Sequence, residues 1–229
     1  MKSLESSMHR CFRVCVPIIA LLMAFAAPHG AAAQEEFPPP AGKGRVVVVA
    51  SGGSGPREYR DIAKKIAALG YDAVLFDSSH WSATDTGLRA AITTALQMPH
   101  ALPGKIGLVG LSLGGGFVLA FGTALSDQVA VVVAWYPVTA PFKDPPGWAS
   151  RVKVPTVMFA GEYDSYQGCC LIDKARAIGK AAQAVGAPFE LTTYPQTEHG
   201  FAIAGASYNA EVSRDAFART EAALKKALN

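Results

Sequence analysis

Residues 105–125 of this chain read KIGLVGLSLGGGFVLAFGTAL, and this stretch decides the fold. An apolar run leads into the pattern G-x-S-x-G, and a smooth apolar segment that predicts a helix leads out of it. Strand, G-x-S-x-G and helix in this order are typical of a nucleophile elbow. Gly110 and Gly114 leave room for a sharp turn that lifts the hydroxyl of Ser112 above the sheet edge. The pattern therefore predicts a serine nucleophile at Ser112 rather than a plain glycine-rich turn.

The rest of the chain alternates strand and helix patterns around this stretch. A continuous β-branched run, VVVVA at 46–50, is typical of a strand buried on both faces. The other strands are predicted at 73–76, 106–109, 129–134, 154–160 and 189–194, and helices at 56–69, 85–98, 171–185 and 208–228. Strands joined by helices imply an α/β fold with a mainly parallel sheet, whose ligands bind at the carboxyl ends of the strands.

Two further polar motifs directly follow the last two predicted strands. Asp164 ends the motif GEYD, and His199 lies in the motif EHGF. With Ser112 they give the chain order nucleophile, acid, histidine, which is the order of the α/β-hydrolases. His199 would accept the proton of Ser112, while Asp164 would fix the imidazole tautomer and offset its charge. Glu162 is the nearest substitute for the acid.

An oxyanion hole for this nucleophile needs two N–H donors. The residue after the nucleophile, Leu113, supplies one of them. The other is expected from the glycine-rich loop SGGSG at 51–55, where we favour Gly53 and keep Gly52 as the alternative. This loop has neither G-x-G-x-x-G nor the lysine of a phosphate loop, which argues against a dinucleotide or phosphate site.

The motifs GLSLG, GEYD and EHGF together resemble those of the dienelactone hydrolase family of α/β-hydrolases. The resemblance extends over nearly all of residues 45–229. It implies a compact hydrolase core without a large cap, and only the short segment 136–153 separates two strands where other hydrolases insert one. The enzymes that name the family use a cysteine nucleophile, whereas Ser112 favours a general ester or lactone. The family's substrate-carboxylate arginines have only positional candidates here, Arg57 and Arg89.

Aromatic residues on or beside the loops at the carboxyl ends of the predicted strands could form an apolar acyl or aryl site. They are Trp81, Trp135, Tyr136, Phe142, Trp148, Tyr163, Tyr166 and Phe201. About half of them are expected to be packing residues. The substrate contacts that we predict from this set are Trp81, Trp135, Tyr136, Tyr163 and Phe201.

Residues 1–33 have the features of an export signal. Basic residues form a positive leader, residues 14–27 form an apolar stretch of signal-peptide length, and three alanines ending at Ala33 give a small-residue cleavage pattern before Gln34. A retained membrane anchor is the alternative, but the apolar run is short for a bilayer and contains a proline. We therefore expect a periplasmic or secreted protein with a Pro/Gly-rich linker at 34–44, ahead of the hydrolase domain.

The composition suits a compact globular core, since half of the residues are apolar and 17% are charged. The formal net charge of +3 falls close to zero without the leader, so nothing indicates nucleic acid or an anionic membrane as a partner. We expect no cofactor and no metal ion.

Cys169 and Cys170 are the only cysteines that follow the leader. In an oxidising compartment they could form a vicinal disulfide, stay as free thiols or form an intermolecular bridge. A metal site is not expected here, because no third ligand lies nearby in the sequence. Neither cysteine lies on an elbow, which argues against a cysteine nucleophile.

The sequence as a whole predicts a secreted serine hydrolase that cleaves a small carboxylic ester or lactone through an acyl-enzyme. Peptidase or thioesterase chemistry is a close variant of this function. A binding module on a hydrolase fold that no longer turns over is the alternative from a different class, because a fold alone does not prove activity.

Overall fold

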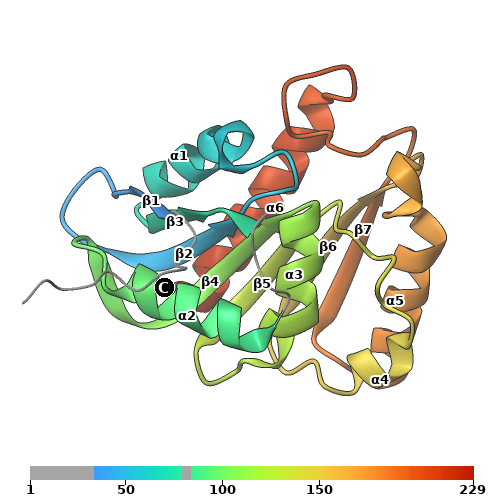
Figure 1. Cartoon of the computed structure of the whole chain (residues 1–229), viewed down its shortest axis with the longest axis horizontal. Helices are drawn as coiled ribbons and strands as arrows, with labels where there is room; N and C mark the ends of the chain where they lie inside the picture. The colour runs from blue at the N-terminus through green and yellow to red at the C-terminus, as the bar shows by residue number, and fades with distance from the viewer. Residues whose placement is uncertain (1–33, 79–83) are drawn as a thin grey trace, which may run out of the picture. The chain divides into compact units, whose positions relative to one another are not determined.

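The chain folds around a seven-stranded sheet in the computed structural model, which describes residues 34–78 and 84–229 (Figure 1). The strand order is β1-β3-β2-β4-β5-β6-β7, and every neighbouring pair except β1–β3 is parallel. The strands are β1 (Gln34–Phe37), β2 (Gly44–Ala50), β3 (Asp72–Phe76), β4 (Ala101–Leu111), β5 (Val129–Trp135), β6 (Thr156–Gly161) and β7 (Phe189–Tyr194). The predicted α/β class with a mainly parallel sheet is confirmed.

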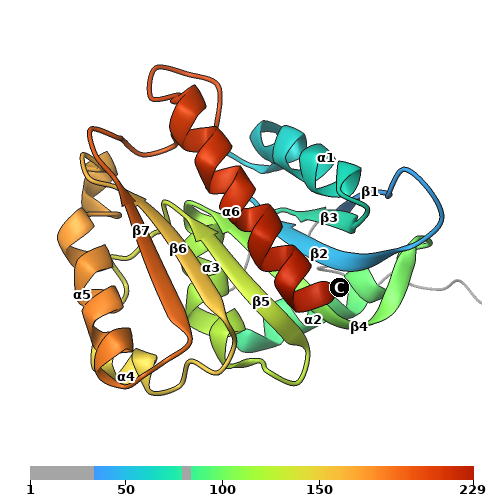
Figure 2. The same ribbon diagram turned by 180° about the vertical axis from the view of Figure 1, so that it is seen from behind.

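Helices cover both faces of this sheet. They are α1 (Arg60–Ala68), α2 (Asp85–Leu96), α3 (Leu113–Phe121), α4 (Pro145–Ala149), α5 (Ile172–Ala184) and α6 (Ala210–Leu228). In β2, Val46 and Val48 pack in the core shared with α2 and α3, while Val47 and Val49 pack in the core shared with α1 and α6. Figure 2 shows α6 crossing the face of the sheet whose core it shares with α1. The alternation of side chains along a strand explains why a run of valines suits this position.

The motif loops meet at one edge because the strands that carry them are parallel. β4 ends at Leu111, β6 at Gly161 and β7 at Tyr194, and each strand leads into one of the three motifs. Between β5 and β6 the described chain holds only the five-residue helix α4, which packs its Trp148 into the core. The segment between β5 and β6 therefore contains no cap domain.

The interpretation of residues 34–44 as a linker is wrong for Gln34–Phe37. These four residues pair antiparallel with β3 and give its outer edge a partner. A strand with two glutamates among four residues lacks the apolar pattern used for prediction, although an edge strand tolerates charge. The predicted export signal lies outside the described residues. Among the residues that are described, no helix is long and apolar enough to cross a membrane.

Element boundaries also differ from the predicted ones. The predicted helix at 56–69 begins as a 3₁₀ turn, Pro56–Tyr59, before α1. β4 begins five residues earlier than expected, at Ala101, because its first part pairs with the start of β2 before a register shift. A further 3₁₀ turn, Tyr166–Gly168, follows β6 in a segment for which the sequence predicts no element.

Candidate active site

Ser112 occupies the turn between β4 and α3 in a strained backbone conformation. Its φ of 54° and ψ of −114° are values that L residues rarely adopt. A Cβ on Gly110 would overlap the carbonyl oxygen of Gly114, and a Cβ on Gly114 would overlap that of Ala50. The Ser112 N–H donates to the carbonyl of Trp135 at 3.0 Å and ties the turn to β5. The elbow therefore needs glycine at both flanking positions, as the sequence pattern indicates.

The structure brings the three polar residues of the motifs into one hydrogen-bonded chain. Ser112 Oγ lies 2.8 Å from His199 Nε2, and His199 Nδ1 lies 2.8 Å from Asp164 Oδ2. The side chain of Asp164 is 1% exposed and that of His199 is 12% exposed. A hydroxyl, an imidazole and a buried carboxylate in this order can pass a proton from the serine to the histidine and stabilise the resulting imidazolium.

Asp164 rather than Glu162 faces the histidine. The second carboxylate oxygen of Asp164 accepts the backbone N–H of Tyr166 at 3.2 Å, so both oxygens are bonded. Glu162 instead pairs with Arg176 at 2.9 Å and accepts the hydroxyl of Thr193 at 3.0 Å. The geometry favours the predicted acid over its substitute.

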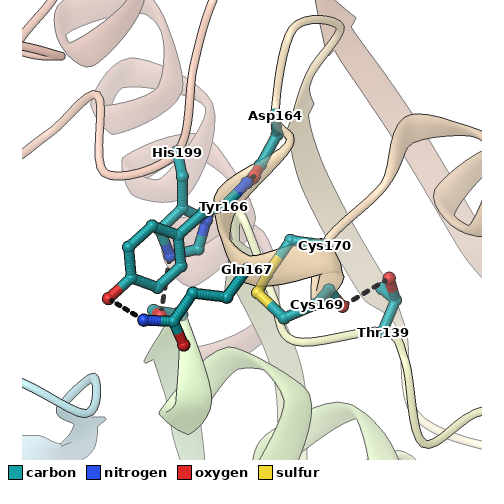
Figure 3. The surroundings of a disulfide bond; sticks show 8 residues. Thr139, Asp164, Tyr166, Gln167, Cys169, Cys170 and His199 are labelled. Carbon is teal, nitrogen blue, oxygen red and sulfur yellow. Dashed lines mark hydrogen bonds and ion pairs between the residues drawn. A yellow bond between two sulfur atoms is a disulfide. The ribbon is translucent and has the colours of Figure 1, made fainter.

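Two tyrosine rings enclose the imidazole of His199. Tyr166 stacks on it with ring centroids 4.8 Å apart and an interplanar angle of 8° (Figure 3). Tyr136 meets it edge-on, with ring centroids 5.0 Å apart. Tyr136 also has a positive φ of 34°, and its hydroxyl has no hydrogen-bond partner among the described residues. Burial raises the pKa of Tyr136 well above its ordinary value, so this hydroxyl stays protonated. A strained residue with an unused donor next to the histidine is a candidate substrate contact.

A vicinal disulfide lies beside the triad. Cys169 and Cys170 are bonded to each other, so the structure contains the first of the three alternatives that the sequence left open (Figure 3). The carbonyl of Cys169 accepts the N–H groups of Thr139 at 2.9 Å and Ala140 at 2.8 Å, which fastens the acid loop to the segment after β5. A third candidate ligand that is distant in sequence, His199, has one ring nitrogen within 4.8 Å of both sulfur atoms. Both sulfur atoms are used by the disulfide.

Both residues predicted to supply the oxyanion donors line the cavity at Ser112. Leu113 is the first residue of α3, so its N–H has no acceptor within the helix. Leu113 and Gly53 both line the cavity that contains Ser112. Gly52, the alternative, is buried, and a Cβ on it would come within 3.1 Å of Cβ of Ser112.

The triad opens into a cavity of about 540 Å³. Its walls come from the loop after β2, the elbow, the acid loop and residues 203–207 after the histidine. A hollow of about 770 Å³ lies elsewhere, between the sheet and the end of α6, and contains no member of the triad. The cavity of about 540 Å³ is therefore the candidate substrate site, because it contains Ser112.

Of the predicted substrate contacts that the structure describes, Tyr136 alone lines this cavity. Trp135 is fully buried, because it continues the alternation of β5 onto the face covered by α6 and donates its indole N–H to Thr220. Phe201 is fully buried beneath the site and stacks on Trp135. Tyr163 is 61% exposed and lies outside the cavity. Trp81 lies outside the described residues.

Of the remaining aromatic candidates, Tyr166 lines the cavity, whereas Phe142 and Trp148 do not, and neither do the two candidate arginines. Phe142 and Trp148 pack against each other in the core, and Arg89 pairs with Asp127 at 3.1 Å. Arg57 is exposed and does not line the cavity. Tyr59 does line the cavity, although in the sequence it lies in a predicted helix whose pattern indicates only core packing.

The sequence of this chain matches the model of a known protein family. The model of the dienelactone hydrolase family matches residues 75–228. A search of curated protein sequences gives no match.

Solved structures share the fold at low sequence identity. A candidate dienelactone hydrolase from Klebsiella pneumoniae is 21% identical, with a TM-score of 0.73 over 84% of this chain and 92% of that one. The dienelactone hydrolase-like promiscuous phosphotriesterase P91 from metagenomic libraries is 15% identical, with a TM-score of 0.70 over 87% and 100%. Esterase 2 of Thermogutta terrifontis, bound to propionate, is 17% identical, with a TM-score of 0.63 over 84% and 88%. With the family match over two thirds of its length, the chain belongs to the dienelactone hydrolase family.

Proposed function

We propose that this chain is a serine hydrolase that cleaves a small carboxylic ester or lactone through Ser112, His199 and Asp164. The observation that carries the proposal is the unbroken hydrogen-bond chain from the serine hydroxyl through both imidazole nitrogens to a buried carboxylate. Membership of the family supports an ester-hydrolysing enzyme of this kind. The cavity beside Ser112 would hold the acyl group and the leaving group.

The reaction would proceed in two halves. Ser112 Oγ bonds to the carbonyl carbon, its proton passes to His199 Nε2, and the carbonyl π pair moves onto oxygen. Collapse of this intermediate breaks the bond to the leaving oxygen, which takes the proton from His199. Water then repeats the sequence with His199 as base, which releases the acid and restores Ser112. Asp164 holds the imidazole through Nδ1–H in both halves.

The size of the cavity supports a small substrate, because about 540 Å³ lies in the lower half of the range usual for ligand sites. Esterase 2 of Thermogutta terrifontis, which shares the fold, has been solved with propionate and phosphorylated by paraoxon. Short-chain and aryl esters are therefore the first substrates to test. Thioesterase or peptidase activity would use the same residues and is separated by adding thioesters and peptides to the same screen.

Covalent labelling tests the nucleophile. A fluorophosphonate probe should label the wild type at Ser112, and Ser112→Ala should not be labelled. The variant should keep its fold and lose hydrolysis by about 10⁴-fold or more, because the remaining groups cannot form the acyl-enzyme. Ester turnover by Ser112→Ala close to the wild-type rate would refute the assignment. A folded wild type that is neither labelled nor active would favour the non-catalytic binding module.

We also propose that the chain is exported and cleaved near Gln34. The leader pattern of residues 1–33 and the Cys169–Cys170 disulfide support this, since disulfides persist mainly in oxidising compartments. Mass spectrometry of the protein recovered from its producing cell should give an N-terminus near Gln34. Recovery of a soluble cytoplasmic protein that starts at Met1 would contradict export.

A further inference from the structure

We propose that the hydroxyl of Tyr59 donates a hydrogen bond to the oxyanion of the tetrahedral intermediate, beside the N–H of Leu113. This rests on the proposed function, because the oxyanion forms only when Ser112 attacks a carbonyl carbon. The proposal assigns the second donor of the oxyanion hole to a side chain, whereas the sequence motifs predict that a glycine N–H supplies it. Donors aimed at the developing charge supply much of the catalysis in acyl transfer.

The phenol of Tyr59 lies directly beside the nucleophile. Tyr59 lines the same cavity as Ser112 and Leu113, and only 2% of it is exposed. A Cβ built on Gly52 would overlap the Tyr59 hydroxyl and also come within 3.1 Å of Cβ of Ser112. The Tyr59 hydroxyl therefore occupies the space that a side chain at position 52 would fill, next to Ser112, and this position requires glycine.

The proton of this hydroxyl is available to the substrate. Ser54 Oγ donates to the phenolic oxygen at 3.3 Å. Burial raises the pKa of Tyr59 above its ordinary value, and hydrogen bonds from Ser54 and from the Gly52 backbone offset part of that rise. Both bonds use the oxygen as an acceptor, which leaves the O–H to donate. The phenol thus stays protonated at neutral pH and has a donor to offer.

The position of the hydroxyl is set before substrate binds. Tyr59 closes the 3₁₀ turn that Pro56 begins, and α1 starts at the next residue. Its ring belongs to the buried cluster under α1, so it does not need to rotate into place. A donor that is already oriented costs no reorganisation during the reaction. During acylation Tyr59 would keep its proton, while the proton of Ser112 moves to His199.

The test compares two tyrosine hydroxyls. Tyr59→Phe removes the proposed donor and keeps the ring, whereas Tyr71→Phe removes a buried hydroxyl that has no partner among the described residues and does not line the cavity. On one soluble ester, Tyr59→Phe should lower kcat by about 10²-fold with little change in KM. Its affinity for an aryl boronic acid, which forms a tetrahedral adduct with the serine, should fall by a similar factor. Tyr71→Phe should match the wild type in all three quantities.

Two results for Tyr59→Phe would contradict the proposal. A kcat for Tyr59→Phe within about threefold of the wild type, or a rise in KM alone, would overturn it, since a ground-state contact changes binding without changing kcat. If Tyr59→Phe loses its fold, Ser54→Ala replaces it, because this variant keeps the phenol and removes only its hydrogen bond. Ser54→Ala should lower kcat several-fold at constant KM, and an unchanged kcat would overturn the proposal. A wild type that the fluorophosphonate fails to label would instead refute the proposed function.

Discussion

Two buried aspartates of this sheet lie in contrasting surroundings. Asp164 follows the carboxyl end of β6 and has both oxygens bonded, to His199 and to the N–H of Tyr166. Asp72 is the first residue of β3, fully buried, and neither of its oxygens has a hydrogen-bond partner among the described residues. Burial, with the nearby Glu36 carboxylate, raises the pKa of Asp72 to about 6. Burial alone thus does not define the role of a carboxylate, because the groups that contact it differ between the two sites.

A second contrast concerns the histidine partners of carboxylates. His100 Nδ1 lies 3.1 Å from Glu36 close to Asp72, much as His199 pairs with Asp164. The pair at His199 continues to a serine on a strained turn, whereas His100 lies before β4, at the amino end of the sheet. In this fold the carboxylate–histidine pair that is a candidate for catalysis is the one to which the parallel strands bring a serine.

The largest expected effect breaks the bonded carboxylate. Asp164→Asn should lower kcat/KM by about 10⁴-fold, because an amide does not stabilise the imidazolium and can hold the wrong tautomer. Glu162→Gln is the matched control, since its carboxylate contacts Arg176 and Thr193 instead of the histidine. The measurement is kcat/KM on one soluble ester for both variants. A large loss of kcat/KM in Glu162→Gln, together with a kcat/KM near the wild-type value in Asp164→Asn, would show that the acid is misassigned.

Periodicity and strand ends predicted six of the seven strands, the elbow, and the three residues that the structure joins by hydrogen bonds, because these depend on local patterns and on parallel topology. The orientation of side chains near the site could not be read in the same way. Trp135 ends β5 and is buried, whereas the next residue, Tyr136, has a positive φ and lines the cavity, and the sequence pattern does not separate the two. Tyr59 is brought to Ser112 by tertiary packing across 53 positions of sequence, for which no motif exists.

The second prediction concerns the unbonded carboxylate and affects stability. Because the pKa of Asp72 is raised from 3.8 to about 6 on folding, its protonated form favours the native state, and this contribution is lost as the pH rises through about 6. The free energy of unfolding of the wild type should therefore fall by up to about 3 kcal/mol more than that of Asp72→Asn between pH 4 and pH 8. Denaturant unfolding at both pH values measures this.

Activity provides the control for this experiment. Asp72 lies at the amino end of its strand and does not line the cavity, so Asp72→Asn should keep kcat and KM near the wild-type values at pH 8. Parallel pH profiles of stability for wild type and variant would mean that Asp72 does not titrate with the raised pKa.

The smallest expected effect loosens the loop that carries Asp164. The Cys169–Cys170 bond closes the shortest possible loop, so it restricts the unfolded chain little and should stabilise the whole fold only slightly. Its effect should be local, because residues 164–170 also place Tyr166 on the imidazole and the Tyr166 N–H on Asp164. Replacing both cysteines by serine should lower kcat by about tenfold or less, since small displacements of catalytic groups slow the reaction.

Reduction of the wild type by a phosphine should reproduce this loss, and the same treatment should leave the double serine variant unchanged. The melting temperature should shift by no more than about 2 °C in either case, because the bond contributes little to global stability. This is the reverse of Asp72→Asn, which changes stability and spares activity. An unchanged kcat after verified reduction would mean that the loop holds Asp164 without the disulfide. A large fall in melting temperature would mean that the bond supports the fold as a whole rather than the site.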